Sequence, residues 1–89
     1  MSDDELLEKV KTGLNVDGTD NDNALRIKVM AVKQYMLNSG VTSEAIQTEL
    51  GIATLTIGVN DIWNLDPGEI KFSYAFDMCL MPQLKVISM

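Results

Sequence analysis

The chain has 89 residues, with 13 acidic side chains against seven basic ones, no histidine and one cysteine. This length supports a single domain of residues 1–89, and so short a chain buries only about 60–65% of its unfolded surface, so we expect partners to add stability. The acidic balance argues against ordinary duplex binding, which depends on lysine and arginine. The lack of histidine removes the commonest general base and imidazole ligand. We therefore expect no enzyme activity, cofactor or metal.

The beginning of the sequence is acidic, whereas a signal peptide begins with basic residues, and no apolar run approaches the length of about 20 residues that spans a membrane. A lone cysteine, Cys79, has no partner for a disulfide within the chain. These features favour a protein made in a reducing cytosol. We interpret Cys79, between Met78 and Leu80, as a small buried hydrophobic residue.

The negative charge is concentrated near the start of the chain. Residues 1–22 hold seven acids and two bases, whereas residues 23–89 hold six acids and five bases. Asp17, Asp20 and Asp22 do not follow the spacing of a calcium-binding loop, in which the glycine comes later than Gly18 does. We interpret them as turn and cap residues, or as an acidic lobe that stays close to DNA without binding it.

The first helix is predicted over residues 3–14. Ser2 and Glu5 have the spacing of a capping box, and the apolar residues that follow fall on one helical face: Leu6, Leu7, Val10 and Leu14. Residues 15–23 are dense in asparagine, aspartate and glycine, which predicts a loop. Asp22 or Asn23 is the expected cap of the next helix.

That next helix, at about residues 23–39, is predicted to be apolar on two faces and to end at Gly40. One face carries Leu25, Val29, Val32 and Met36; the other carries Ile27, Met30, Ala31 and Leu37. Charged residues, Arg26 and Lys33, lie between the two faces. Such a helix is either central in its own domain or shared between a core and an interface.

Between this helix and the end of the chain, the pattern predicts three further helices. The first begins at Thr42 or Ser43 and ends near residue 50, with Gly51 breaking or bending the chain. Residues 54–60 alternate as a strand would, but a longer apolar arc of Ile52, Leu55, Val59, Ile62 and Trp63 favours a helix over residues 53–64. We expect Trp63 to be a core residue, and residues 66–68 (DPG) predict a turn.

Ser73 is predicted to cap the last helix. At regular helical spacing, one side of this helix carries Phe76, Leu80, Leu84 and Ile87, and the other carries Tyr74, Met78 and Met81. Pro82 predicts a kink or an early end near Met81. The expected fold class is all-α, a small bundle of four to five helices around a long central helix at about residues 23–39.

Several segments share their order with a known family: residues 4–11 (DELLEKVK), 22–25 (DNAL), 32–36 (VKQYM), 58–64 (GVNDIWN) and 72–76 (FSYAF), followed by Gln83 and Leu84. In this order they resemble the head-tail connector (head-completion adaptor) proteins of tailed phages. The resemblance covers nearly the whole chain but contains no catalytic motif. Pro82 departs from the uninterrupted last helix that the family suggests.

The resemblance implies a virion structural protein at the head-tail junction. It implies a ring of about a dozen copies that binds the portal protein and a downstream neck or stopper protein and extends the channel through which DNA passes without sequence-specific binding. Residues 84–89 match the segment that docks against the portal. No membrane contact is implied.

From the apolar surplus we expect contacts with other chains through Ile27, Met30, Leu37, Tyr74, Met78, Met81, Leu84 and Ile87, with Asp17, Asp20 and Asp22 facing the channel. The alternative is a small acidic phage protein that mimics DNA and inhibits a nucleic-acid enzyme. A mimic would space its carboxylates like phosphates along an extended face.

Overall fold

The protein is described by a computed structural model over residues 2–16, 18–63 and 72–89. The elements in chain order are α1 (Asp3–Leu14), α2 (Asp22–Asn38), α3 (Ser43–Ile46), α4 (Glu49–Trp63), the π-helical segment η1 (Ala75–Leu80) and α5 (Met81–Ile87). No strand occurs in these described ranges. The predicted all-α class and the long second helix are confirmed. The predicted turn at residues 66–68, and Asn64 and Asp17, lie outside the described residues.

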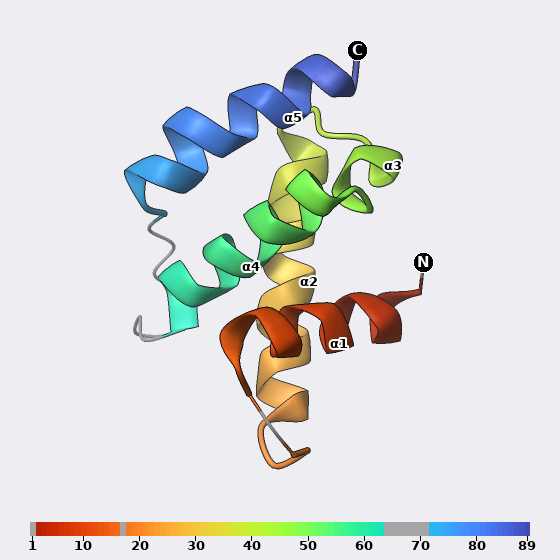
Figure 1. Ribbon diagram of the computed structural model, residues 1–89, viewed down its shortest axis with the longest axis vertical. Coiled ribbons are helices and arrows are strands. Elements are labelled where there is room, and N and C mark those ends of the chain that lie inside the picture. The colour runs from red at the N-terminus through yellow and green to blue at the C-terminus, as the bar shows by residue number, and fades with distance from the viewer. Residues whose placement is uncertain (1, 17, 64–71) are drawn as a thin grey trace.

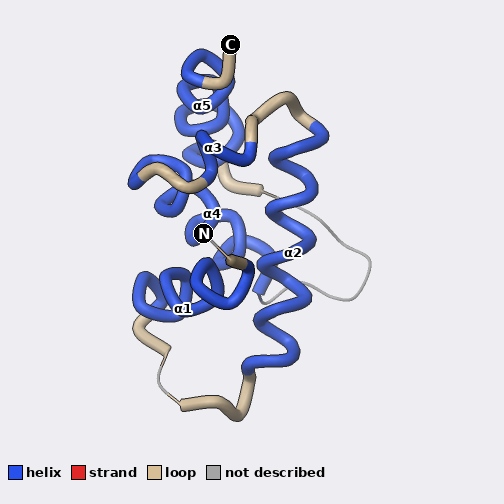
Figure 2. The backbone as a smooth tube through the Cα atoms, turned by 90° about the vertical axis from the view of Figure 1, so that its right-hand side faces the viewer, coloured by secondary structure: helices blue, strands red, loops and turns tan. Residues whose placement is uncertain are grey.

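The longest helix, α2, runs along the molecule, and the other helices pack against one side of it. Figure 1 shows α1 crossing the first half of α2, while η1 and α5 lie near its other end. Figure 2, turned by 90°, shows α1, α4 and α5 stacked along α2. This arrangement leaves the opposite side of α2 uncovered by the described elements.

The first helix has the bounds that the sequence predicts, because its start signal is local. Ser2 accepts a hydrogen bond from the backbone N–H of Glu5 at 3.2 Å, and the side chain of Glu5 accepts one from the N–H of Ser2 at 3.3 Å, which completes the predicted capping box. Asn15 ends the helix in the left-handed conformation. Leu6, Leu7 and Val10 are buried.

The second helix begins at Asp22, with Asn21 as its N-cap, so the predicted cap at Asp22 or Asn23 is wrong by one or two residues. Its end is as predicted. Gly40 has φ +104°, its N–H donates to the carbonyl of Leu37, and the N–H of Val41 donates to that of Met36. This is the pattern of a Schellman cap, which requires positive φ at the glycine.

The chain after Gly40 differs from the prediction at Gly51. Thr42 caps α3, but this helix ends at Ile46, and Gly51 lies in the first turn of α4. A Cβ at Gly51 would overlap the carbonyl oxygens of Ala45 and Ile46. Glycine is therefore needed here for close backbone packing, and it does not break the helix. The helix-or-strand ambiguity is resolved as helix, which begins at Glu49, earlier than predicted.

Ser73 caps the last helix as predicted, because its hydroxyl accepts a hydrogen bond from the N–H of Phe76 at 3.3 Å. The helix neither ends nor breaks at Pro82. It runs as a π-helix to Leu80 and as an α-helix from Met81, with the N–H of Met81 donating to the carbonyl of Phe76 five residues back. A wide turn ahead of proline is one way for a helix to continue past it.

The core lies where α1, α2, α4 and the last helix meet. Gly58 marks the closest approach, since a Cβ there would lie 2.6 Å from the ring of Phe76 and 2.7 Å from Val32. Trp63 packs, partly buried, against the edge of this core. The buried hydrophobic residues are Leu6, Leu7, Val10, Leu25, Val29, Val32, Met36, Val41, Ala45, Ile46, Leu55, Val59, Ile62, Phe76, Met81 and Leu84.

Candidate interaction surfaces

The second helix has the two apolar faces that its sequence predicts. The first face, with Leu25, Val29, Val32 and Met36, forms its buried side. On the opposite side Ile27 is 70% exposed and Met30 is 50% exposed. Leu37 is partly buried against the core. Large apolar side chains gathered on one uncovered helix face mark an interaction surface.

The last helix is also apolar on two sides, but the division differs from the one expected. Met81 and Leu84, proposed as interface residues, are buried in the core. The reason is the π-helical segment: the residue five positions after Phe76, Met81, faces the core, while Leu80 is only partly buried. The outer side carries Tyr74, Met78, Val86 and Ile87.

Cys79 was expected to be a buried hydrophobic residue, and this is wrong. It is exposed on the last helix, as a free thiol. The same change of helical spacing that brings Met81 into the core leaves Cys79 outside it. No group of three or more histidine, cysteine, aspartate or glutamate side chains within the described parts of the chain could hold a metal ion.

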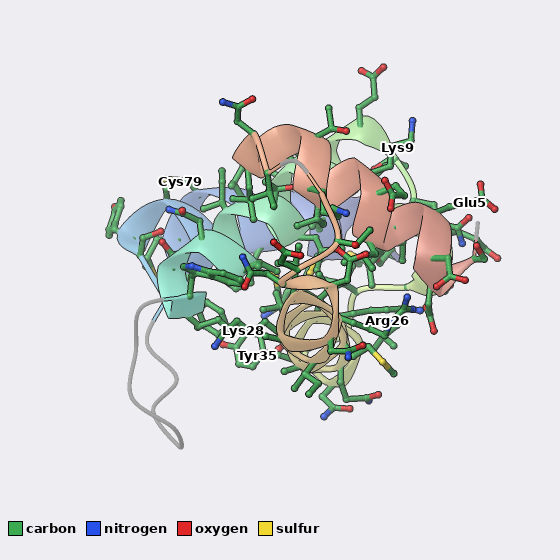
Figure 3. The ribbon with its side chains drawn as sticks, turned by 90° about the horizontal axis from the view of Figure 1, so that it is seen from below. Glu5, Lys9, Arg26, Lys28, Tyr35 and Cys79 are labelled. Carbon is green, nitrogen blue, oxygen red and sulfur yellow. The ribbon has the colours of Figure 1, made fainter. Side chains whose placement is uncertain are left out.

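Part of the negative charge near the start of the chain is neutralised by α2. Lys33 donates to Asp3 at 2.8 Å, and Arg26 pairs with Asp4. Figure 3 shows Arg26 extending from α2 towards the first turn of α1. The hydrogen bond from Lys33, and secondly its charge, lower the pKa of Asp3 below the ordinary value of 3.8. Both pairs are solvent-exposed and contribute little to stability.

A third ion pair involves a proposed channel-facing residue. Lys11 is buried in α1, where its ammonium contacts Asp22 at 2.7 Å and donates to the carbonyl of Gly18 at 2.7 Å. Glu8 lies 3.8 Å from the same ammonium. Asp22 is therefore half-buried and paired, while Asp20 is exposed. The acidic lobe presents less free charge than the sequence count indicates.

Aromatic rings join α2 to the start of the last helix. Phe72 stacks on Phe76 with ring centroids 4.2 Å apart, and Tyr35 lies 4.8 Å from Phe72. The hydroxyl of Tyr35 donates to Asp77 at 3.4 Å. Two turns earlier on the same side of α2, the ammonium of Lys28 lies 5.7 Å from the ring centroid of Trp63, within cation–π range.

A groove of about 500 Å³ lies between α1 and the first half of α4. Its walls are mainly apolar, and Lys9 and Glu49 provide its charged groups; the full lining is Lys9, Thr12, Gly13, Glu49, Ile52, Ala53, Thr56 and Ile57. None of the proposed interface residues lines it. No helix in the described ranges has both the length and the apolar content to cross a membrane.

Sequence reasoning missed two features of these surfaces. Val86 is 67% exposed, but it was left out of both predicted faces of the last helix. The pairing of Arg26 and Lys33 with the first turn of α1 depends on how two helices cross, which no local pattern specifies. The only sequence signal for these ion pairs was the position of Arg26 and Lys33 between the two apolar faces of α2.

No protein-family model matches the chain, and no curated protein or solved structure is significantly similar to it.

Proposed function

We propose that this chain is a structural subunit of a head-tail connector ring in a tailed phage, with no catalytic role. In this role it docks beneath the portal protein, extends the DNA channel towards the tail and meets a downstream neck protein. Its place is the head-tail junction of the virion. The observation that carries the proposal is the pair of uncovered apolar faces, one on α2 and one on the last helix.

These two faces suit a repeating assembly. A contact between different surfaces of identical subunits is heterologous, and it closes into a ring when the rotation between neighbours allows. Ile27 and Met30 supply one surface, while Tyr74, Met78 and Ile87 supply another.

The segments that resemble connector proteins meet one another in the fold. Gly58 packs between Val32 and Phe76, and Tyr35 and Phe72 belong to the same aromatic cluster. Three segments distant in sequence are thus needed together to build one core. The exposed apolar faces on α2 and the last helix lie outside this core and are available for assembly.

The charge pattern is compatible with a channel subunit and less so with a DNA mimic. Lys33, Arg26 and Lys11 neutralise Asp3, Asp4 and Asp22, so no extended row of free carboxylates remains along α1 and the start of α2. A mimic depends on such a row. Asp20 and Glu5 stay exposed and would discourage DNA from sticking to this lobe.

The test is to combine the purified chain with the portal protein from the same genome and image the mixture by electron microscopy. We expect rings of the chain on the portal. The double variant Ile27→Asp/Met30→Asp should fold but fail to form rings, while Asn60→Asp, an exposed change on α4 away from both apolar faces, should still form them. A chain that neither assembles nor binds the portal would refute the proposal.

A further inference from the structure

The outer side of the last helix carries an unbroken apolar ridge, which we call the outer ridge. It consists of Tyr74, Met78, Pro82 and Val86, spaced four residues apart, which is close to one turn in both the π-helical and the α-helical part, and of Met89, which follows the end of the helix. Tyr74 is 74% exposed and Met78 is 62% exposed, and the other three are also exposed. Phe76, Met81 and Leu84 point the other way, into the core.

The outer ridge is large for a small domain. An aromatic side chain such as Tyr74 offers on the order of 150–250 Å² when fully exposed, and the smaller methionine, valine and proline side chains offer less, so the five mostly exposed side chains together present on the order of 500 Å². That is near the upper end of the apolar patch on a typical monomer. It is more than half of the roughly 800 Å² that each partner buries in a specific interface. The ridge is therefore wide enough to be the centre of one interface.

The spacing of the ridge makes it complementary to itself. Met78 and Val86 lie four residues on either side of Pro82, and Tyr74 and Met89 lie eight before and seven after it. If two copies pack antiparallel about a two-fold axis at Pro82, Met78 meets the second copy's Val86. Tyr74 then lies beside the second copy's Met89. Contacts of this reciprocal kind define an isologous dimer.

The charges beside the ridge favour the same arrangement. Asp77 and Lys85 are the charged side chains of residues 74–89, and they lie four residues on either side of Met81. Both fall on the same flank of the ridge at helical spacing. Antiparallel packing brings each Asp77 near the other copy's Lys85, twice per dimer. Parallel packing would instead place the charged flanks of the two copies on opposite sides of the pair, so that neither Asp77 comes near the other copy's Lys85.

We infer that the free chain forms a two-fold dimer in which the last helices pack antiparallel along the outer ridge, with Pro82 at the axis. A dimer of this kind is closed and cannot grow into a ring. It covers Tyr74, Met78 and Ile87, which the proposed ring also uses. The dimer itself does not depend on the proposed function. Only its role as a resting form, which would open when the chain binds the portal, rests on the proposed function.

Disulfide trapping tests whether Pro82 lies on the two-fold axis of the dimer. In a Cys79→Ser background, Pro82→Cys should form dimers under mild oxidation, because residues on a two-fold axis meet their own copies. Met78→Cys alone should not, since its two copies would lie about 12 Å apart along the helices, beyond disulfide reach. Adding Val86→Cys to Met78→Cys should restore trapping. Efficient trapping by Met78→Cys alone would indicate parallel packing and overturn the inference.

Charge reversal tests the ion pairs between Asp77 and Lys85 of the two copies and leaves Pro82 unchanged. Asp77→Lys and Lys85→Asp should each weaken the dimer about fivefold or more in sedimentation equilibrium, and the double reversal should bring the dissociation constant back towards that of the wild type. A double variant that dimerises no more tightly than the single variants would contradict the pairing. A wild-type chain that stays monomeric up to about 1 mM would contradict the dimer itself, because a dimer with a micromolar dissociation constant is almost fully formed at that concentration.

The two proposals fail separately. Rings on the portal from a chain that shows no dimer would overturn the dimer and leave the connector role standing. Dimers trapped through Pro82→Cys from a chain that never binds the portal would overturn the connector role and leave the dimer standing.

Discussion

One carboxylate oxygen of Asp61 accepts two hydrogen bonds from Ser73, from its backbone N–H at 2.9 Å and from its hydroxyl at 2.8 Å. Asp61 belongs to α4, and Ser73 caps the last helix. The Ser73 hydroxyl also accepts a bond from the N–H of Phe76. This single carboxylate therefore fixes the start of the last helix against the end of α4.

Replacing Asp61 with alanine should lower the free energy of unfolding by about 1–3 kcal/mol, because two partly buried donors lose their acceptor. Asp61→Asn should cost less, since an amide oxygen can take the same two bonds without the charge. Urea unfolding followed by circular dichroism measures both. Asn60→Ala, an exposed change one residue away, is the control, and equal effects of Asp61→Ala and Asn60→Ala would contradict the role of the carboxylate.

Gly58→Ala should destabilise the fold by about 1–3 kcal/mol through overpacking against Val32 and Phe76, although alanine is the better helix former by about 1 kcal/mol. The reference is Ala53→Gly at an exposed site of the same helix, which reports propensity alone. Adding Val32→Ala should make room, so the double variant should be less destabilised than the sum of the single changes. Strict additivity in urea unfolding would rule out the close approach.

Lys11→Met should lower stability by about 1–3 kcal/mol, because the half-buried carboxylate of Asp22 and the carbonyl of Gly18 lose their cationic donor. Lys9→Met, on the exposed side of the same helix, should stay within about 0.5 kcal/mol of the wild type. Thermal unfolding separates the two, with a shift of about 4–8 °C per kcal/mol expected for a domain of this size. Identical melting curves for both variants would count against the buried ion pair.

The stability should depend weakly on acid pH through Asp3. Its pKa is lowered in the folded chain by the bond from Lys33, so its contribution is present above the ordinary value of 3.8 and is lost as the pH falls through the lower folded value. Because the pair is exposed, the effect is a few tenths of a kcal/mol. Wild type and Asp3→Asn should differ near neutral pH and converge between about pH 4 and pH 2. A difference that widens in acid would reverse the assignment.

The helices of the first half could be predicted because their signals are local. Ser2 and Glu5 are three residues apart, and Gly40 needs positive φ at the place where the pattern of α2 stops. Gly51 was misinterpreted because its role depends on carbonyls of α3 that the sequence does not place beside it. A glycine in a sequence is compatible with a helix break and with a close approach of two backbones, and tertiary packing decides which of the two occurs.

The candidate surfaces were predictable only in part. Ile27 and Met30 follow from the regular spacing of α2, which places them opposite Leu25 and Val29. Met81 was wrongly assigned to the surface because regular spacing does not hold through the π-helical segment. Leu84 was wrongly assigned as well, although regular spacing places it on the same side as buried Phe76. The pairs of Lys33 and Arg26 with α1 depend on a crossing of helices, which emerges only in three dimensions.

That wide turn also has a consequence for how the chain tolerates changes in length. Removing one residue between Phe76 and Met81 would place Met81 four residues after Phe76, so an ordinary α-helical turn would keep Met81 and Leu84 facing the core. The same deletion between Met81 and Leu84, where the helix is already α-helical, would instead rotate the residues after it by about 100°. The end of the chain should thus tolerate the loss of one residue in the wide turn, but not the loss of one residue just after it.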